Sequence, residues 1–430
     1  MGTHHAPRFG FSQSSFYIAV RYLWGRAKEG GRYLRGAAAG IALSLVPIIV
    51  TLIVADGMIR GITNRYLELG TGHIQVFDYV GYDEFPEALQ REIRAIPGVR
   101  GAWREKQGLG IILGKEGRVG ATIRAVESGF WTDPGSAEYL EVLSGSAELE
   151  SEKELLLGRG LAETLAAEPG STVRLMTIRV NEEGQHLPKV TIFTVKGIIS
   201  SGYRELDSLW CIINHEAGLT LLSPELYRSF LIAKVNNPYT DLDDITEDLM
   251  ICTGPGYGVY TWKELQQSLY KSFETTRQML LFIMALLVLV AAVNVSSATS
   301  MLVIERQRDI AVLKTGGAGP RSIQNVFLWG AFLTGLAGAV GGITMGLLIG
   351  RGINTIIRGL EKALSFIASP WGGEVKILDP DYYLETIPII IDWKMVFIIG
   401  LFTLLCSCLA SFVPAHRAGK CKPLEILRRV

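Results

Sequence analysis

The apolar residues of this chain are gathered in four long runs, and a polar region separates the first run from the second. The first run, "GAAAGIALSLVPIIVTLIVADGMI", carries a single charged residue, Asp56, near its end. The second run, from Met279 to Ile304, carries no charge at all. About 20 predominantly apolar residues are enough for a helix to cross the hydrocarbon core of a membrane. The pattern therefore predicts four membrane spans with one large domain after the first.

Lysine and arginine are concentrated in the segments before the first span, between the second and third, and after the fourth. Such enrichment is typical of cytoplasmic flanks, so the large polar region is placed on the opposite side. The predicted parts are an amphipathic N-terminal segment (1–35), the first span (36–60), the large external domain (61–270), a stalk with the second span (271–304), a cytoplasmic coupling helix (305–322), the third span (323–350), an external loop (351–394), the fourth span (395–414) and a cytoplasmic tail (415–430).

The external domain alternates between strand and helix patterns, which predicts an α+β fold. "GHIQVF" and "FLIAKV" alternate like strands, and "FPEALQREIRAIPGV" has a helical period. Near the end of the domain, Thr261 and Glu264 form a capping box, so we expect a helix that runs from there directly into the second span.

Composition excludes several classes of function. The net charge is zero, which gives no support for a nucleic-acid partner. The chain has no GxSxG or HExxH motif and no GxxxxGK[ST] phosphate loop, so it is not expected to hydrolyse ATP itself. His73, His186 and His215 are isolated, and each is expected to be solvated or hydrogen-bonded. A zinc site is not expected from the spacing of the five cysteines. Cys211 and Cys252 both lie in the external domain, and their spacing leaves open whether they pair.

Two features of the spans have more than one interpretation. Gly338, Gly342, Gly346 and Gly350 recur at intervals of four in the third span, and such a ladder serves either packing within the subunit or contact between two copies. The second span is polar toward its cytoplasmic end, where Asn294, Ser296, Ser297, Thr299 and Ser300 are more typical of hydrogen bonding between helices than of an ion path.

The charged stretch "ERQRDIAVLKTGGAGPRSI" between the second and third spans predicts a short amphipathic helix. Arg306 and Asp309 are three residues apart, and Ile310 and Leu313 share an apolar strip. Gly316 and Gly317 are expected to end this helix, and Pro320 to start the next. The residues alone allow either a membrane-surface helix or a docking element for a cytoplasmic partner.

This stretch resembles the coupling segment of the FtsX-like ABC permease family, and the tail "VPAHRAGKCKPLEILR" resembles the end of that family. "YIAVRYLWGRAKEGGRYL" and "LLLGRGLAETLAAEPGSTVRL" are similar to the lipoprotein-releasing LolC/LolE permeases. The four-span order with one large external domain is shared with MacB, which carries its own ATPase domain.

The resemblance implies a MacB-like architecture: an α-helical membrane protein with four transmembrane helices plus a large α+β periplasmic domain, in the bacterial inner membrane. It implies a dimeric permease, with a second copy or a paralogue, that binds a separate ABC ATPase dimer. Such a permease extracts lipoproteins from the membrane and passes them to a periplasmic carrier. The chain itself then holds no cofactor, and ATP and Mg²⁺ belong to the partner ATPase.

The resemblance also assigns roles to particular residues. Contact with the ATPase is expected at Arg306, Asp309, Ile310 and Leu313. Acyl chains are expected to contact the outer halves of the first two spans, at Leu52, Ile53, Met58, Met279, Leu280 and Phe282. The hairpin from Ile178 to Phe193 corresponds to the hook that LolC members present to the carrier, with the candidate tip residues Asn181, Glu182, Glu183, Gly184, Gln185, His186, Leu187 and Pro188.

The hairpin here is shorter than the family's hook and lacks a tip rich in phenylalanine and proline. The subunit type, LolC-like or LolE-like, therefore stays open at this point. Two other functions are compatible with the pattern: a MacB-like exporter of peptides or antibiotics, and an FtsX-like regulator of a cell-wall hydrolase.

Overall fold

The computed structural model describes residues 16–17, 19–20, 31–79, 81, 85–180, 185–222, 227–240, 242–368, 384 and 386–421. The chain divides into two compact units. The membrane unit comprises Met1–Gly57, Glu274–Lys362 and Pro388–Val430, and the sheet unit comprises Met58–Phe273 and Ala363–Ile387.

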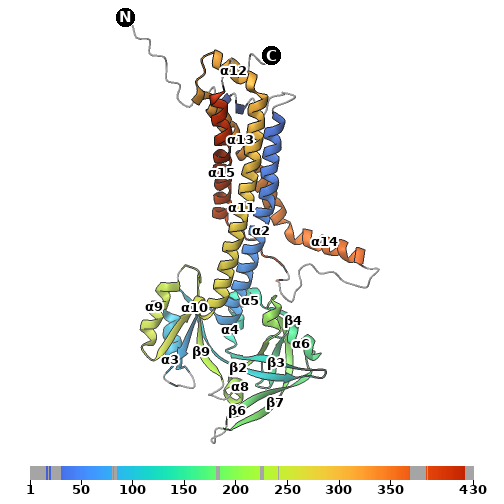
Figure 1. Ribbon diagram of the computed structural model, residues 1–430. Coiled ribbons are helices and arrows are strands. Elements are labelled where there is room, and N and C mark those ends of the chain that lie inside the picture. Colours follow the sequence, from blue (N-terminus) through green and yellow to red (C-terminus); the bar gives the residue numbers. More distant parts are fainter. Residues whose placement is uncertain are drawn as a thin grey trace. The chain divides into compact units, whose positions relative to one another are not determined.

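Four helices of the described chain are long and apolar enough to cross a membrane, which confirms the predicted number of spans. They are α2 (Gly31–Arg65), α11 (Gln267–Glu305), α13 (Pro320–Arg351) and α15 (Trp393–Lys420) (Figure 1). Each extends past the span expected from the sequence, because its polar flanking residues continue the helix. A helix of 35 residues, such as α2, exceeds the roughly 20 that a membrane requires.

The glycine ladder of α13 packs against α2 within this chain. A Cβ atom on Gly342 would lie 2.7 Å from Cβ of Leu45 and 2.8 Å from the carbonyl oxygen of Ala42. A Cβ atom on Gly346 would lie 2.7 Å from Cβ of Ile49. The backbones of α13 and α2 therefore approach each other closely, because the glycines have no side chain to keep them apart. Packing within the subunit is the interpretation that the structure supports.

The polar residues in the second span include one that joins two helices. Oγ1 of Thr299 lies 3.2 Å from Oγ of Ser411, so a hydrogen bond links α11 to α15 in the interior of the bundle. Oγ of Ser300 instead donates to the carbonyl oxygen of Ser296 in its own helix.

Two shorter helices flank α13. Helix α12 (Gln307–Thr315) ends at Gly316, and Pro320 occupies the first turn of α13, as the sequence predicts. Helix α14 (Ile353–Ala368) lies in the region that was expected to be a loop, residues 351–394. The helix forms because apolar residues recur there at helical spacing, a pattern that the loop prediction overlooked.

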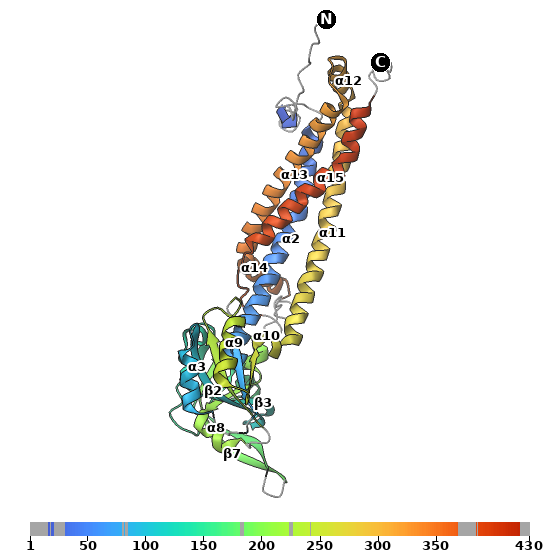
Figure 2. The same ribbon diagram turned by 90° about the vertical axis from the view of Figure 1, so that its left-hand side faces the viewer.

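The sheet unit contains one ten-stranded mixed sheet, in which the order is β10-β1-β9-β2-β3-β8-β5-β7-β4 and β6 pairs with β2 and β7 (Figures 1 and 2). The pairs β3–β8 and β5–β7 are parallel and the others antiparallel. The strands are β1 (Ile74–Asp78), β2 (Val99–Leu113), β3 (Arg118–Val126), β4 (Glu141–Gly145), β5 (Glu154–Gly158), β6 (Thr172–Val180), β7 (His186–Ser200), β8 (Trp210–Asn214), β9 (Arg228–Val235) and β10 (Tyr257–Thr261).

Helices of the sheet unit cover the two largest of its apolar cores. One core gathers β3, β5, β6 and β8 with α6 and α8, and the other gathers β1, β9 and β10 with α3 and α9. The helical elements are η1 (Tyr66–Thr71, a π-helix), α3 (Glu87–Ala95), α4 (Gly129–Thr132), α5 (Pro134–Tyr139), α6 (Arg159–Leu165), α7 (Arg204–Asp207), α8 (His215–Leu221), α9 (Leu242–Thr253) and α10 (Trp262–Leu265).

The predicted continuous helix from the capping box into the second span is wrong in one detail. The capping box of Thr261 and Glu264 is present, but it starts the four-residue helix α10. The chain leaves helical geometry at Gln266 (φ −109°, ψ 34°), and α11 begins at Gln267. The indole of Trp262 donates to the carbonyl oxygen of Pro238 at 3.1 Å, which holds α10 on the sheet unit and accounts for the break.

Cys211 and Cys252 are both free thiols in the structure. Cys211 is buried in β8, and burial raises the pKa of its thiol to about 12. Cys252 lies in α9 beside Glu92, so each cysteine packs in a different core.

The glycine ladder generates a test of helix packing. Gly342→Ala inserts a methyl group between α13 and α2, and overpacking of this kind costs about 1–3 kcal/mol. Gly330→Ala in the same helix is the matched control, since among the described residues no atom beyond the backbone of α13 itself lies within 4 Å of its added Cβ. We expect the apparent unfolding midpoint of the purified full-length protein to fall for Gly342→Ala and not for Gly330→Ala. Equal midpoints would contradict the close packing.

Candidate functional site

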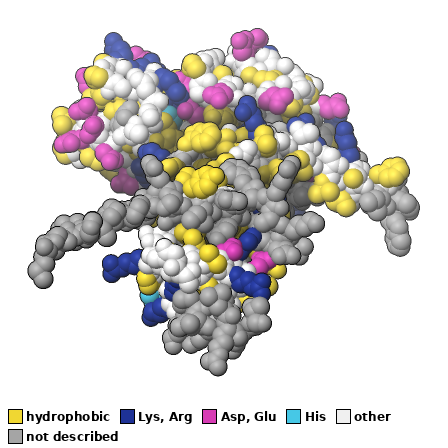
Figure 3. Space-filling model, turned by 90° about the horizontal axis from the view of Figure 1, so that it is seen from above, with side chains coloured by type: hydrophobic (Ala, Val, Ile, Leu, Met, Phe, Trp, Pro, Cys, Tyr) yellow, Lys and Arg dark blue, Asp and Glu magenta, His cyan; other side chains and the backbone are white. Residues whose placement is uncertain are grey.

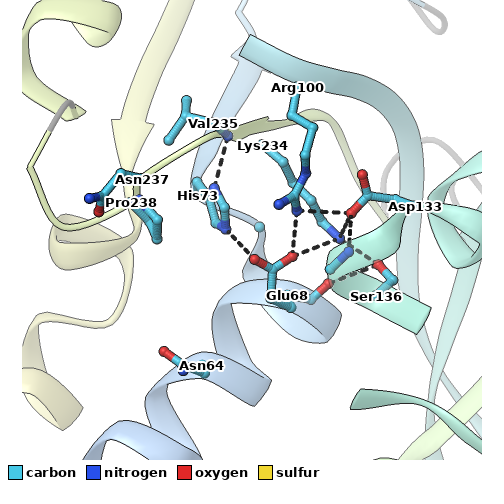
Figure 4. Close-up of polar contacts among 12 residues, drawn as sticks. Asn64, Glu68, His73, Arg100, Asp133, Ser136, Lys234, Val235, Asn237 and Pro238 are labelled. Atoms are coloured by element: carbon cyan, nitrogen blue, oxygen red, sulfur yellow. Dashed lines mark hydrogen bonds and ion pairs between the residues drawn. The ribbon is translucent and has the colours of Figure 1, made fainter. Parts of the chain in front are cut away.

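Six polar residues from separate segments of the chain meet where α2 ends in the sheet unit (Figure 4). We call them the Glu68 cluster: Glu68, His73, Arg100, Asp133, Ser136 and Lys234. Glu68 lies in η1, the π-helix that follows α2 without a break. Single π-helical turns are frequent at functional positions, because they change the direction in which a helix presents its side chains.

Glu68 is at the centre of the ion pairs. Its Oε2 lies 2.7 Å from Nη2 of Arg100 and 3.3 Å from Nζ of Lys234. Oδ2 of Asp133 shares the same two cations, at 2.9 Å from Arg100 and 3.2 Å from Lys234. Two carboxylates therefore face two cations, and the charges balance within the cluster.

His73 enters the cluster as a neutral ring. The amide of Val235 donates to Nδ1 of His73 at 2.9 Å, so the proton of a neutral ring is on Nε2. Nε2 in turn lies 3.1 Å from Oε1 of Glu68, to which it donates. Burial lowers the pKa of His73 below its ordinary value, and the hydrogen bond to Glu68 opposes this effect only in part.

Lys234 is fully buried, which is uncommon for a lysine. Its ammonium lies 4.2 Å from the ring centre of Phe130, and it donates to Oγ of Ser136. Burial lowers the pKa of Lys234, whereas the carboxylates of Glu68 and Asp133 raise it. The ammonium is therefore held by its two carboxylate partners.

The arrangement does not match a Ser-His-Asp catalytic triad. Oγ of Ser136 donates to the carbonyl oxygen of Glu68 at 3.1 Å, and His73 makes its two hydrogen bonds to Val235 and Glu68. A triad requires the histidine to accept the serine proton. The cluster instead fixes the end of a helix to a sheet.

A second buried ion pair, between Arg124 and Glu105, binds the same π-helix. The guanidinium of Arg124 forms two parallel bonds with the carboxylate of Glu105, at 2.6 and 2.7 Å, and both side chains are only 1% exposed. Arg124 also donates to the carbonyl oxygens of Leu69 and Gly70. These carbonyls close η1, where a helix normally lacks partners for its last acceptors. Positive charge there is also favourable for the helix dipole.

The last turn of α2 makes further contacts inside the sheet unit. Nε of Arg65 donates to the carbonyl oxygen of Ser201 at 2.7 Å, and its guanidinium lies over the ring of Tyr139. The amide of Trp262, the first residue of α10, donates to the carbonyl oxygen of His73 at 3.0 Å. The chain therefore enters the sheet unit and leaves it at adjacent, hydrogen-bonded positions.

The membrane unit has its own ionic cluster. Asp56, the one charge noted in the first span, is buried, and its Oδ1 lies 3.3 Å from Nε of Arg277 in α11. Nη2 of Arg277 lies 3.3 Å from Oδ2 of Asp392. Asp392 also caps α15, because its Oδ1 accepts from the amides of Lys394 and Met395. Three membrane helices are linked by this cluster.

The predicted ATPase-coupling residues lie on or beside α12, with different exposures. Nη1 of Arg306 lies 3.2 Å from Oδ2 of Asp309, as the spacing predicts. Ile310 is buried among apolar side chains of α2, α11, α13 and α15, and Leu313 is half-buried. The apolar strip thus faces the bundle, and the outward face of α12 carries Arg308 and Val312 instead.

Lys314 has a role that the sequence did not indicate. Its Nζ donates to the carbonyl oxygens of Gly419, at 2.7 Å, and Cys421. Lys314 therefore caps the end of α15. In the view from above, Lys and Arg side chains gather around the end of the bundle at which α12 lies (Figure 3).

The six predicted cavity residues separate into three groups by exposure. Leu52 and Ile53 are buried in the core of the membrane unit, and Ile53 packs on Gly350. Met279 and Phe282 are 64% and 67% exposed. Leu280 and Met58 are half-buried. Within this chain, the α11 positions are the ones available to a ligand.

The predicted carrier hairpin is formed by β6 and β7, which pair from Thr172–Thr194 to Val180–His186. Of the predicted tip, residues 181–184 lie outside the described residues. Gln185, His186, Leu187 and Pro188 are described and exposed. Below the tip, Ile111, Met176 and Val190 align across three strands. Together with the exposed Leu109, Ile178 and Ile192 they form an apolar sheet face, which we call the hairpin face.

The Glu68 cluster could not be predicted from the sequence, because most of its members are far apart along the chain. Glu68 lies near His73, and Asp133 near Ser136, but these two pairs, Arg100 and Lys234 come together only in the fold. His73 was expected to be an isolated residue, either solvated or hydrogen-bonded. The hydrogen-bonded interpretation is the one that the structure shows. A lysine inside the apolar strand "FLIAKV" was the available signal, since a buried lysine requires an acidic partner.

The Glu68 cluster generates the following prediction. Lys234→Met leaves the carboxylates of Glu68 and Asp133 with one cation fewer, and removal of one partner of a buried pair costs about 3–5 kcal/mol. We expect faster hydrogen exchange of the amides of η1 in the full-length protein. Lys196→Met is the matched control, because Lys196 pairs with Glu150 and Glu154 near the surface. Unchanged exchange in Lys234→Met would contradict the role of the cluster.

Two family models match this chain in consecutive regions. The model described as the MacB-like periplasmic core domain matches residues 36–240, and the model described as the FtsX-like permease C-terminal matches residues 281–423. The first region contains α2 and most of the sheet, and the second contains α12, α13 and α15. The predicted fold class is confirmed.

Whole-length relatives include LolC and LolE, each named a lipoprotein-releasing system transmembrane protein. LolC of Xylella fastidiosa is 26% identical over 97% of this chain and 99% of the relative. LolC of Neisseria meningitidis serogroup B is 27% identical over 96% of this chain and 98% of the relative. LolE of Haemophilus influenzae is 24% identical over 96% of this chain and 98% of the relative. This chain is therefore a membrane permease similar to LolC and LolE over nearly its whole length, in which a MacB-like periplasmic core domain is joined to an FtsX-like permease C-terminal domain.

Proposed function

We propose that the chain is the transmembrane permease subunit of an ABC transporter that extracts lipoproteins from the inner membrane. A separate ATPase drives the extraction with ATP and Mg²⁺, and a periplasmic carrier receives the lipoprotein. The observation that carries the proposal is the similarity to LolC and LolE along nearly the whole chain, across both units.

The attachment of the periplasmic core domain supports a mechanical role. Both helices that connect it to the membrane, α2 and α11, are covalently continuous with elements of the sheet unit. Glu68 and Arg124 fix the end of α2, and the amide of Trp262 fixes the start of α10. A displacement of α2 is therefore passed to the sheet through buried bonds, and α11 is joined to α10 by the chain itself.

Coupling to the ATPase is assigned to α12, with a revised set of contacts. Arg308 and Val312 project from its exposed face, and the ion pair of Arg306 with Asp309 supports its first turn. Ile310 and Leu313 then transmit movement inward, because their side chains pack toward the bundle. The permease acts as a dimer with a second copy or a paralogue.

The lipid anchor of the substrate is assigned to the exposed side of α11. Burial of acyl chains is favourable by about 0.8 kcal/mol per CH₂, so an apolar lining holds a lipid anchor without charged contacts. Met279 and Phe282 provide such a lining, and Arg277 beside them is held by Asp56 and Asp392.

Binding of the periplasmic carrier is assigned to the hairpin of β6 and β7. An exposed loop on a rigid sheet is a usual recognition site. The hairpin face adds apolar area: Ile178, Val190 and Ile192 are 51%, 54% and 58% exposed. Contiguous apolar surface of this kind is typical of protein contacts.

A crosslinking experiment tests the function. We expect a photocrosslinking amino acid at Met279 or Phe282 to capture lipoprotein in native membranes, because these side chains line the proposed path. Val340 of α13 and Leu409 of α15, which are 57% and 72% exposed, serve as control positions. Capture at the control positions alone would contradict the path, and capture of another substrate class would favour a MacB-like exporter.

A binding experiment tests the carrier site. Ile192→Asp places a charge on the hairpin face, and deletion of Asn181 to Lys189 removes the tip. We expect both changes to weaken binding of the carrier to the purified permease. Ile251→Asp in α9 is the control, since Ile251 is 75% exposed and lies outside the hairpin. Unchanged affinity in both hairpin variants would move carrier recruitment elsewhere on the domain or to another subunit.

A further inference from the structure

Helix α14 has two chemically distinct faces. At 3.6 residues per turn, its apolar side chains project to one side. They are Ile353, Ile356, Ile357, Leu360 and Leu364. The opposite side is mainly polar, with Asn354, Arg358, Glu361, Lys362 and Ser365, although the exposed Phe366 also lies on it near the end of the helix. A helix with this division normally buries its apolar face against another element.

In this chain the apolar face is only partly covered. Ile356 and Leu360 are 47% and 52% exposed, and Ile353, Ile357 and Leu364 are half-buried. In water an apolar face this exposed would be unfavourable, at about 25 cal/mol for each Å². The face therefore requires an apolar environment that the described chain does not supply.

The position of α14 along the chain identifies that environment. The membrane-spanning helix α13 ends at Arg351, and α14 begins after the single residue Gly352. One turn before this break, Leu348 is 65% exposed on α13. The start of α14 is thus at the level where the span leaves the hydrocarbon core, and Figure 1 shows α14 turning away from the axis of α13.

We propose that α14 lies in the membrane–water interface on the external side of the membrane that α13 crosses. Its apolar face is then in the acyl chains and its polar face is toward water. Amphipathic helices bound in this way bury their apolar side about 5–10 Å below the headgroups. The occupant of the face is therefore the lipid surface of the same membrane that α13 crosses.

The charges of α14 fit this partner. Within α14, Arg358 and Lys362 outnumber the one acidic side chain, Glu361, and Arg351 at the end of α13 adds a further basic residue just before the helix. Nε of Arg358 donates to the carbonyl oxygen of Asn354 at 3.2 Å, which places the guanidinium on the polar face. Basic residues at this level contact anionic lipid headgroups.

Photocrosslinking to lipid tests the proposal in the full-length protein. The protein is reconstituted in nanodiscs of phosphatidylethanolamine and phosphatidylglycerol, with a diazirine amino acid at Leu360 or at Lys362. Leu348 provides a positive control, as an exposed position on the span itself. We expect lipid adducts at Leu360 at a level similar to that at Leu348, and a loss of adducts at Lys362. Ile356 is a second position on the same face if the Leu360 variant does not fold.

Three outcomes would overturn the proposal. These are equal lipid labelling at Leu360 and Lys362, no lipid adduct at Leu360 or Ile356 while Leu348 is labelled, and adducts at Leu360 with protein in place of lipid. The last outcome would assign the face to a protein partner. None of these outcomes depends on whether the substrate is a lipoprotein.

Discussion

The carbonyl groups at the end of the first long helix need hydrogen-bond donors, and the architecture of the sheet unit follows from how they are supplied. Arg124 donates to the carbonyl oxygens of Leu69 and Gly70, and Ser136 donates to that of Glu68. A guanidinium so deep in a protein requires a carboxylate, which Glu105 provides. One unsatisfied helix end thus explains a buried ion pair on two central strands.

The side chains of the Glu68 cluster are under the same constraint, since buried polar groups need close partners. Removal of two carboxylates from water is costly, and the cost is offset only when cations and donors surround them closely. Arg100 of β2, Lys234 of β9 and the ring of His73, which lies between η1 and β1, meet that requirement. Because each of these segments contributes one partner, none of them shifts alone without exposing a buried polar group. The helix end and the sheet consequently behave as one body.

The sequence was sufficient for features that depend on local pattern. The four spans, the turn at Gly316 and the start of α13 at Pro320 follow from hydrophobic runs and from backbone preferences of glycine and proline. The resemblance to LolC and LolE was also readable from short motifs.

Features that depend on tertiary contact were not predictable. Ile310 and Leu313 share a strip, but only the packed bundle shows that the strip faces inward. Leu52 and Ile53 were assigned to a cavity, yet Ile53 is buried on Gly350, a neighbour from a different span. The break at Gln266 follows α10, which the hydrogen bond from the indole of Trp262 to the carbonyl oxygen of Pro238 holds on the sheet unit. Each case requires knowledge of which residues from remote positions become neighbours.

Lys314 connects two parts of the permease that are far apart in sequence. Because its ammonium is bound to carbonyl oxygens at the end of α15, α12 is tied to that helix by side-chain hydrogen bonds. It lies between α11 and α13 in the chain, so three of the four long helices are attached to it. A change in the position of α12 therefore strains three attachments at once.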